Sequence, residues 1–138
     1  SVMYFRTRIP RNVTLSYNGL AIAPVQAMIN GALFEWVVEN LLKNSLDALQ
    51  GQGEIDVRIS DDLEWVYIDV KDTGKGIPKS NFKRIFEPGF TTKTRGWGLG
   101  LSLSRRIIEE YHKGRIYVVD SEPGRGTTIR IALKRLYA

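Results

Sequence analysis

Apolar residues recur at helical spacing in two segments of the chain, and each segment is followed by a glycine. The first segment covers residues 32–49, where Leu33, Val37 and Leu41 lie on one side, and Gly51 and Gly53 follow it. The second covers residues 99–113 and ends at Gly114. This pattern predicts two long amphipathic helices, each with one buried face.

The buried face of the second helix follows from an advance of about 100° per residue. Its buried half is predicted to hold Leu101, Leu103, Ser104, Ile107, Ile108 and Tyr111, and its polar part Arg105, Arg106, Glu109 and His112. His112 is therefore expected at the polar end of this helix.

Alternating apolar and polar residues predict two hairpins. Ile55–Ile59 and Val66–Val70 flank an Asp61–Asp62 turn, and Arg115–Val119 and Thr127–Leu133 flank a turn over residues 120–126. Helices and antiparallel hairpins in this order favour the α/β class. We expect a two-layer α/β sandwich, with a mixed, mostly antiparallel sheet packed on helices.

The remaining segments are shorter or lack a period. Val13–Tyr17 and Pro24–Met28 are strand candidates, separated by a turn at Asn18–Gly19. Residues 1–9 resemble the end of a truncated helix before Pro10. Residues 79–86 are predicted to form a short helix and residues 87–98 a long loop. No linker separates them, so residues 1–138 are expected to form a single domain, with 1–9 left from a preceding helix.

Composition narrows the possible partners. The chain has no cysteine, which excludes a disulfide scaffold and thiolate zinc sites. Its apolar runs are too short to span a bilayer and no signal peptide is visible, so we expect a soluble domain without membrane contact. The net charge is +5, but the basic residues are dispersed. This favours a phosphate-bearing small molecule over nucleic acid.

Three polar residues form a stripe on the first helix. Asn40 and Asn44 are four residues apart and Asp47 follows three residues later, so they share one side. Half-buried amides that hydrogen-bond to a neighbouring loop would explain the stripe. Amide oxygens presented to a hard cation such as Mg²⁺ would explain it equally well.

Three glycine-rich turns accompany this stripe. Asp72–Pro78 follows a strand and would allow backbone to approach a ligand closely, although a plain turn explains this segment better when it is taken alone. Gly96–Ser102 leads into a helix N-terminus, which favours phosphate, although it is neither a Walker loop nor the dinucleotide fingerprint. Gly124–Thr128 leads into the last strand, and such hairpin turns are common.

In this order and spacing, the motifs resemble the boxes of the GHKL ATP-binding superfamily, above all the catalytic, ATP-binding domain of sensor histidine kinases (Bergerat fold). The resemblance covers residues 12–133. Asn40–Ala48 resembles the N box, Asp72–Pro78 the G1 box, and Phe86–Lys93 the F box with the following lid. Gly96–Ser102 resembles the G2 box and Gly124–Thr128 the G3 box. Trp97 and Gly89 depart from the usual residues of the G2 and F boxes.

The resemblance implies a role for each motif. Asp72 would accept a hydrogen bond from the adenine amine, and Asn44 would coordinate Mg²⁺ with Asn40 beside it. Thr92, Lys93 and Arg95 would form a cationic lid. The residues implied in phosphoryl transfer are Asn40, Asn44 and Lys93, and those implied in nucleotide binding are Asn40, Asn44, Asp47, Asp72, Gly74, Gly76, Ile77, Thr91, Thr92, Lys93, Arg95, Gly96, Gly98, Leu99, Gly100, Leu101, Thr127 and Thr128.

The resemblance also implies partners. A sensor kinase of a two-component system would bind Mg-ATP and pass the γ-phosphoryl group to a histidine on a separate dimerisation domain, and a response regulator would act downstream. The chain is then a cytoplasmic domain of a longer kinase. His112, the only histidine, is not expected to be the acceptor, since no matching acidic neighbour flanks it.

Other classes remain as alternatives. GHKL ATPases of the gyrase, mismatch-repair or chaperone type carry a water-activating glutamate four residues before the magnesium asparagine, where this chain has Asn40. An anti-sigma serine kinase is another alternative, and that class is closer to the sensor histidine kinases than these ATPases are. A non-enzymatic nucleotide-binding module is a further alternative.

Overall fold

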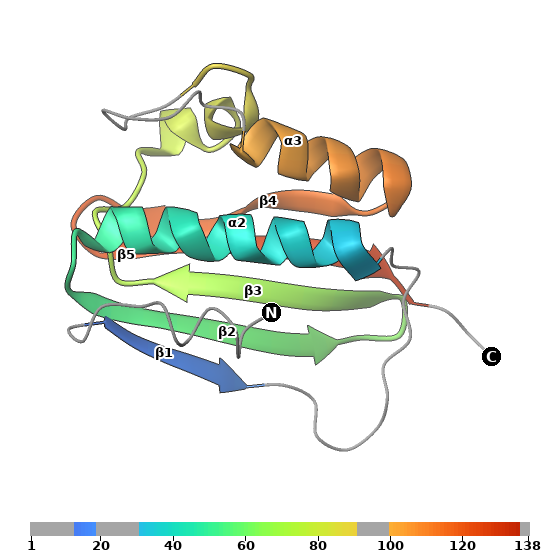
Figure 1. Cartoon of the computed structure of the whole chain (residues 1–138), viewed down its shortest axis with the longest axis horizontal. Coiled ribbons are helices and arrows are strands. Elements are labelled where there is room, and N and C mark those ends of the chain that lie inside the picture. Colours follow the sequence, from blue (N-terminus) through green and yellow to red (C-terminus); the bar gives the residue numbers. More distant parts are fainter. Residues whose placement is uncertain (1–12, 19–30, 91–99, 136–138) are drawn as a thin grey trace.

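The described residues form one sheet with helices on one of its faces (Figure 1). The structure is a computed structural model, which describes residues 13–18, 31–90 and 100–135. Its sheet has five strands in the order β1-β2-β3-β5-β4. Their bounds are Val13–Asn18 for β1, Gly53–Asp61 for β2, Trp65–Asp72 for β3, Arg115–Glu122 for β4 and Gly126–Lys134 for β5. β1 is parallel to β2 and the other neighbours are antiparallel, so the predicted two-layer sandwich is confirmed.

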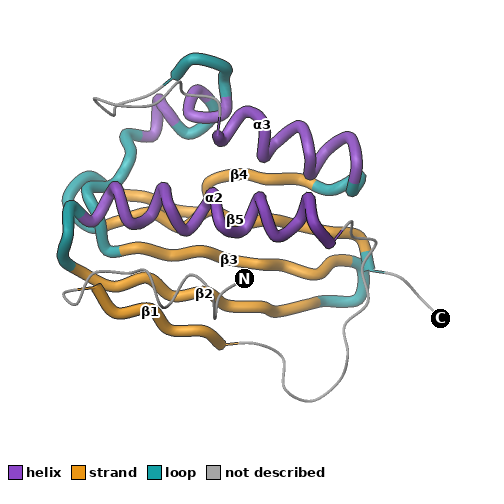
Figure 2. Tube along the Cα trace, in the orientation of Figure 1, coloured by secondary structure: helices purple, strands orange, loops and turns teal. Residues whose placement is uncertain are grey.

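Two long helical segments cover one face of the sheet (Figure 2). α2 (Gly31–Leu49) contacts β2 and β3, whereas α3 (Gly100–Arg106) and its π-helical continuation η3 (Ile107–Tyr111) contact β4. η1 (Lys79–Asn81) and η2 (Arg84–Phe86) are single 3₁₀ turns in place of the short helix predicted over residues 79–86. No helix in these described ranges is long and apolar enough to cross a membrane.

The core lies between these two layers. Strand side chains alternate between the faces of a sheet, and most of those of β2 to β5 that face the helices are apolar and buried. They meet one side of α2. The members with the least exposure include Val37, Leu41, Leu42, Ile55, Val57, Val70, Ile108, Ile131 and Leu133. The helix predicted over residues 32–49 and both predicted hairpins are therefore confirmed.

The helix predicted over residues 99–113 changes its pitch. Tyr111, predicted to be buried, is 62% exposed, whereas His112, predicted to be on the polar side, is only 2% exposed. A π-turn contains more residues per turn than an α-helix, so η3 rotates the last residues relative to a regular helix. This turn carries His112 inward, where Nδ1 lies 3.0 Å from the carbonyl oxygen of Ile107.

The end of this helix also differs from the prediction. Gly114 was expected as the cap, but Lys113 takes the left-handed conformation, with φ of 54°. Gly114 is instead packed so closely on the carbonyl oxygen of Ala132 that a Cβ would clash. The expected elements over residues 1–9 and 24–28, and most of the loop over 87–98, lie outside the described residues.

Side chains of the sheet itself shield the face that has no helix over it in the described part of the chain. Arg130 of β5 donates two hydrogen bonds to the carboxylate of Asp69, at 2.7 and 2.9 Å, and lies 4.6 Å from the ring centre of Tyr67. Arg115 lies 5.5 Å from the ring centre of Trp65. Ala132, paired with Tyr67 and Arg115, is only 3% exposed. The strand backbone is therefore shielded by paired cationic and aromatic side chains.

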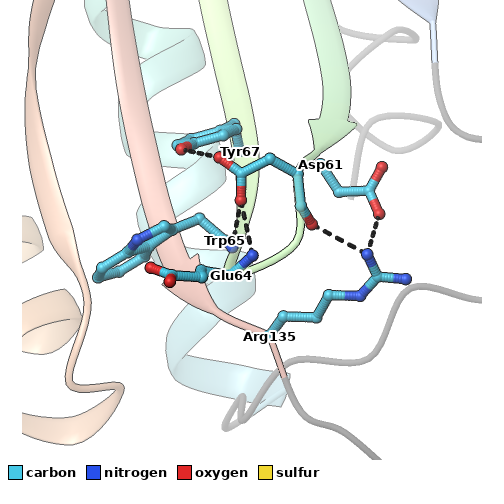
Figure 3. A network of polar contacts seen from close by, with 6 residues as sticks. Asp61, Glu64, Trp65, Tyr67 and Arg135 are labelled. Atoms are coloured by element: carbon cyan, nitrogen blue, oxygen red, sulfur yellow. Dashed lines mark hydrogen bonds and ion pairs between the residues drawn. The ribbon is translucent and has the colours of Figure 1, made fainter.

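The turn between β2 and β3 is fixed by a polar network (Figure 3). The Asp62 carboxylate accepts hydrogen bonds from the Tyr67 hydroxyl and from the backbone N–H groups of Glu64 and Trp65, which together lower the pKa of Asp62. Arg135 then joins the turn to the end of β5, through the Asp61 carboxylate and the Asp62 carbonyl. The network fixes the register of three adjacent strands at one end.

We expect Arg130→Met to lower the free energy of unfolding by about 1–3 kcal/mol, because the Asp69 carboxylate would lose two charge-assisted hydrogen bonds in a partly buried place. Urea denaturation followed by circular dichroism measures this. Arg125→Met is the matched control, since the Arg125–Glu122 pair is 82% and 60% exposed. The control should change stability by less than about 0.5 kcal/mol. Equal losses in the two variants would contradict the role given to Arg130.

Candidate functional site

A buried carboxylate marks the end of β3. Asp72 is 5% exposed, and its Oδ1 accepts a hydrogen bond of 2.9 Å from the N–H of Gly74. The Ser45 side chain of α2 and the backbone of Thr127 also hydrogen-bond to it. Burial nevertheless raises the pKa of Asp72 above its ordinary value, because desolvation outweighs these bonds. A carboxylate held in this way is a fixed hydrogen-bond acceptor.

Backbone packs closely around this carboxylate. A Cβ on Gly74 would lie 2.6 Å from the carbonyl oxygen of Ala48 on α2, and the N–H of Lys75 donates to the same oxygen at 3.1 Å. Gly76, with φ of 78°, packs on the carbonyl oxygen of Glu122, and Gly126 packs on that of Asp72. Only glycine fits at these contacts, so the two predicted glycine turns lie side by side.

Ser121 of β4 connects these turns. Its hydroxyl accepts a hydrogen bond of 2.7 Å from the N–H of Ile77 and donates one of 2.8 Å to the carbonyl oxygen of Gly126. The Thr127 hydroxyl lies 2.8 Å away. Ile77 is half-buried and packs against the core. Neither Ser121 nor Ser45 was predicted as part of the site, because a lone serine carries no motif.

The predicted stripe on α2 lies on one side of the helix. Asn40 and Asn44 are half-buried and Asp47 is exposed. Asn40 donates a hydrogen bond of 3.1 Å from Nδ2 to the hydroxyl of Ser104 on α3. Hydrogen bonding therefore accounts for part of the stripe, but the partner of Asn40 is a neighbouring helix and not the loop that the first interpretation named. Ser45, which is next to Asn44, connects the stripe to Asp72.

The structure brings some of the predicted residues together. Asp72, Gly74, Gly76, Ile77 and Thr127 gather at the end of β3, and Asn40 meets Gly100 where α2 and α3 pack together. Leu101 is half-buried against the core. The predictions for Thr91, Thr92, Lys93, Arg95, Gly96, Gly98 and Leu99 lie outside the described residues.

Thr128 has different strand partners from Thr127. It pairs with Lys71 and Asp120, whereas Thr127 pairs with Asp72. Successive strand side chains point to opposite faces, so the side chain of Thr128 lies on the face without helices. A hollow of about 230 Å³ at the ends of β3, β4 and β5 is nevertheless lined by Thr128 together with Asp72 and Thr127. The role implied for Thr128 therefore stays a prediction.

The described residues contain no group of three or more His, Cys, Asp or Glu side chains that could hold a metal ion. A divalent cation held by these residues alone would have few charged ligands, so ligands from a bound molecule would complete its coordination. Mg²⁺ fits that requirement, since it commonly takes one or two protein oxygens together with substrate phosphates and water. The amides of Asn40 and Asn44 offer such oxygens.

Comparison with known families decides the classification. The family described as histidine kinase-, DNA gyrase B-, and HSP90-like ATPase matches residues 30–136. The chain belongs to this family. The matched range contains α2, β2 to β5 and α3, so this ATPase-family domain includes every described part of the site.

Among curated relatives, sporulation kinase A of Bacillus subtilis (strain 168) is 43% identical over 96 residues. That match covers 70% of this chain but only 16% of the kinase. The chain therefore spans less than a fifth of the length of this kinase.

Among solved structures, the nucleotide-free catalytic domain of histidine kinase ThkA has a TM-score of 0.83 and 28% identity, covering 96% of this chain and 88% of that domain. The structure of ThkA in complex with the response regulator protein TrrA gives a TM-score of 0.81 and 26% identity, covering 97% of this chain and 38% of that one. The fold is that of a histidine kinase catalytic domain.

The raised pKa of Asp72 predicts a pH dependence. When the folded-state pKa of a group exceeds the unfolded one, its contribution to stability is present at low pH and is lost as pH rises through the folded pKa. The free energy of unfolding of the wild-type domain, minus that of Asp72→Asn, should therefore fall as pH rises above 3.8, the ordinary pKa of an aspartate side chain. Denaturation at a series of pH values measures this difference, which removes the contribution of other carboxylates. A difference that increases with pH would contradict the direction of the shift.

Proposed function

We propose that this chain is the ATP-binding catalytic domain of a two-component sensor histidine kinase. Membership of the ATPase family implies nucleotide binding. The observation that supports adenine as the base is the Asp72 carboxylate, buried at the end of β3 and held by Gly74 and Ser45. A carboxylate accepts hydrogen bonds but cannot donate them, so it suits the exocyclic amine of adenine and disfavours the oxygen of guanine at the same place.

The residues around Asp72 would define the base pocket. Gly74 and Gly76 keep the loop close to α2 and to the turn between β4 and β5, and the half-buried side chain of Ile77 in this loop packs against the core. Thr127, on the same face as Asp72, adds a hydroxyl. The base would therefore meet one charged acceptor in an otherwise apolar and backbone-lined place.

Asn44 would hold the magnesium ion that accompanies the nucleotide, with Asn40 beside it. When bound, this ion would neutralise charge on the phosphates, which is much of what phosphoryl transfer requires. Lys93, with Thr92 and Arg95, would contribute further positive charge and hydrogen-bond donors to the phosphates. Asn40, Asn44 and Lys93 are therefore the proposed catalytic residues, and the remaining residues position the nucleotide.

The acceptor of the γ-phosphoryl group would be a histidine of the kinase's own dimerisation helices, and a response regulator would receive the group next. His112 does not suit this role, since it is 2% exposed and Nδ1 lies against the Ile107 carbonyl. A location in the cytoplasm follows from this proposal.

Slow hydrolysis is expected instead of clamp-type ATPase activity. The position four residues before Asn44 holds Asn40, whose amide donates to Ser104 and cannot act as a general base. Glu39 lies about 100° round the helix. The described residues therefore favour a kinase domain over a hydrolase within the same family.

Asp72→Asn should weaken ATP binding by about 2–4 kcal/mol, because an amide group would replace a charged acceptor at the adenine amine. Isothermal titration calorimetry measures the dissociation constant. Asp120→Asn is the matched control, since Asp120 is exposed on β4 and pairs with Thr128 on the other face. Unchanged affinity in Asp72→Asn, with normal melting behaviour, would contradict the assignment of adenine to this carboxylate.

The isolated chain should bind Mg-ATP without phosphorylating itself. Incubation with γ-labelled ATP should leave no acid-labile, base-stable label on it, because its single histidine is buried. Transfer should appear once a dimerisation domain with its histidine is supplied. Stoichiometric label on the chain alone, removed by His112→Gln, would be the opposite result.

A further inference from the structure

α2 and α3 lie side by side over the same face of the sheet (Figures 1 and 2), and a side-chain hydrogen bond joins them. Asn40 is half-buried on α2, and Ser104 on α3 is 0% exposed. The Nδ2 atom of Asn40 donates to the Ser104 hydroxyl at 3.1 Å. No predicted motif contains Ser104, and the proposed function gives it no role.

The Ser104 hydroxyl has only one proton to donate. It donates that proton to the carbonyl oxygen of Gly100, one turn earlier in α3, at 2.8 Å. Towards Asn40 the hydroxyl oxygen can therefore only accept. An acceptor requires the NH₂ end of the amide to face it, so Ser104 decides which way the Asn40 amide is turned.

Gly100 also lies against the amide. A Cβ on Gly100 would lie 2.6 Å from Oδ1 and 2.9 Å from Nδ2 of Asn40, so the amide occupies the space that a side chain would need. Oδ1 is the atom nearest to that place. The amide therefore packs on the Gly100 backbone while its NH₂ end is bound by the Ser104 hydroxyl.

The orientation matters because the two ends of an amide have opposite chemistry. The oxygen can be a ligand to a hard cation or accept from a metal-bound water, whereas the NH₂ group would repel the cation. Asn44 lies on the same side of α2, one turn away. The oxygens of both amides can then bind one cation only if the Asn40 amide has the orientation that the hydrogen bond to Ser104 requires.

We propose that Ser104 is a positioning residue of the nucleotide site: it orients the Asn40 amide so that Oδ1 is available to magnesium bound with the nucleotide. This inference rests on the proposed function. Ser104 touches neither ion nor nucleotide and acts only through Asn40.

The test compares nucleotide affinity with and without Mg²⁺ in the full chain. Calorimetry in the presence of Mg²⁺ should show that Ser104→Ala binds a non-hydrolysable ATP analogue about three- to tenfold more weakly than the wild type does. This is the effect expected for the loss of one hydrogen bond. Without Mg²⁺ its affinity should stay within about twofold of the wild type. In the Asn40→Ala background, Ser104→Ala should have no further effect, since the group it orients is gone.

A second measurement needs no nucleotide. The side-chain amide resonances of Asn40, identified by their loss in Asn40→Ala, should shift and exchange faster with water in Ser104→Ala. Ser104→Cys, which keeps a side chain of similar shape but is a weaker acceptor, should show the same change if the alanine variant folds poorly. Ser80→Ala is the control, because Ser80 is an exposed serine away from α3.

Three results would overturn the inference. The first is an equal loss of nucleotide affinity in Ser104→Ala with and without Mg²⁺. The second is a further loss of affinity when Ser104→Ala is added to Asn40→Ala, and the third is unchanged Asn40 amide resonances in both Ser104 variants. A wild-type chain that binds no adenine nucleotide would contradict the proposed function as well. Normal nucleotide binding with unaltered magnesium dependence in Ser104→Ala would contradict this inference alone.

Discussion

The close packing of backbone at the end of β3 is the constraint on which the site depends. Gly126 lies directly on the Asp72 carbonyl, and Gly76 lies on that of Glu122, so β3, β5 and the two turns can approach only where a Cβ is missing. This contact fixes the register in which Asp72 faces Thr127. A shift of one residue in this register would turn the Asp72 side chain to the other face of the sheet. The glycine packing therefore also determines that Asp72 is the acceptor in the site.

α2 is held to this strand end by backbone as much as by its apolar side. The carbonyl oxygen of Ala48 accepts from Lys75, and Gly74 packs against it, while Ser45 reaches Asp72. The last two turns of α2 therefore carry a hydrogen-bond donor for the buried carboxylate. A site with its acceptor already held by protein groups binds with less loss of conformational freedom.

Much of this arrangement could be predicted from the sequence, because helical and alternating periods locate elements, and glycines next to polar residues indicate turns. The errors have physical causes. A π-turn leaves no periodic signal, so the sides of Tyr111 and His112 were exchanged. Ser45 and Ser104 act through single hydrogen bonds that depend on how elements pack, and no local pattern indicates them.

The two parts of the site differ in how they are held. At the end of β3, backbone contacts at three glycines and the Ser121 hydroxyl hold the turns, so the geometry there follows from the sheet register. Between α2 and α3, by contrast, the Asn40 amide is turned by one hydroxyl. Under the proposed function, sequence change in α3 would therefore alter how phosphate and metal are bound while base recognition is preserved. Such a separation would let one fold keep its nucleotide and vary the chemistry performed on it.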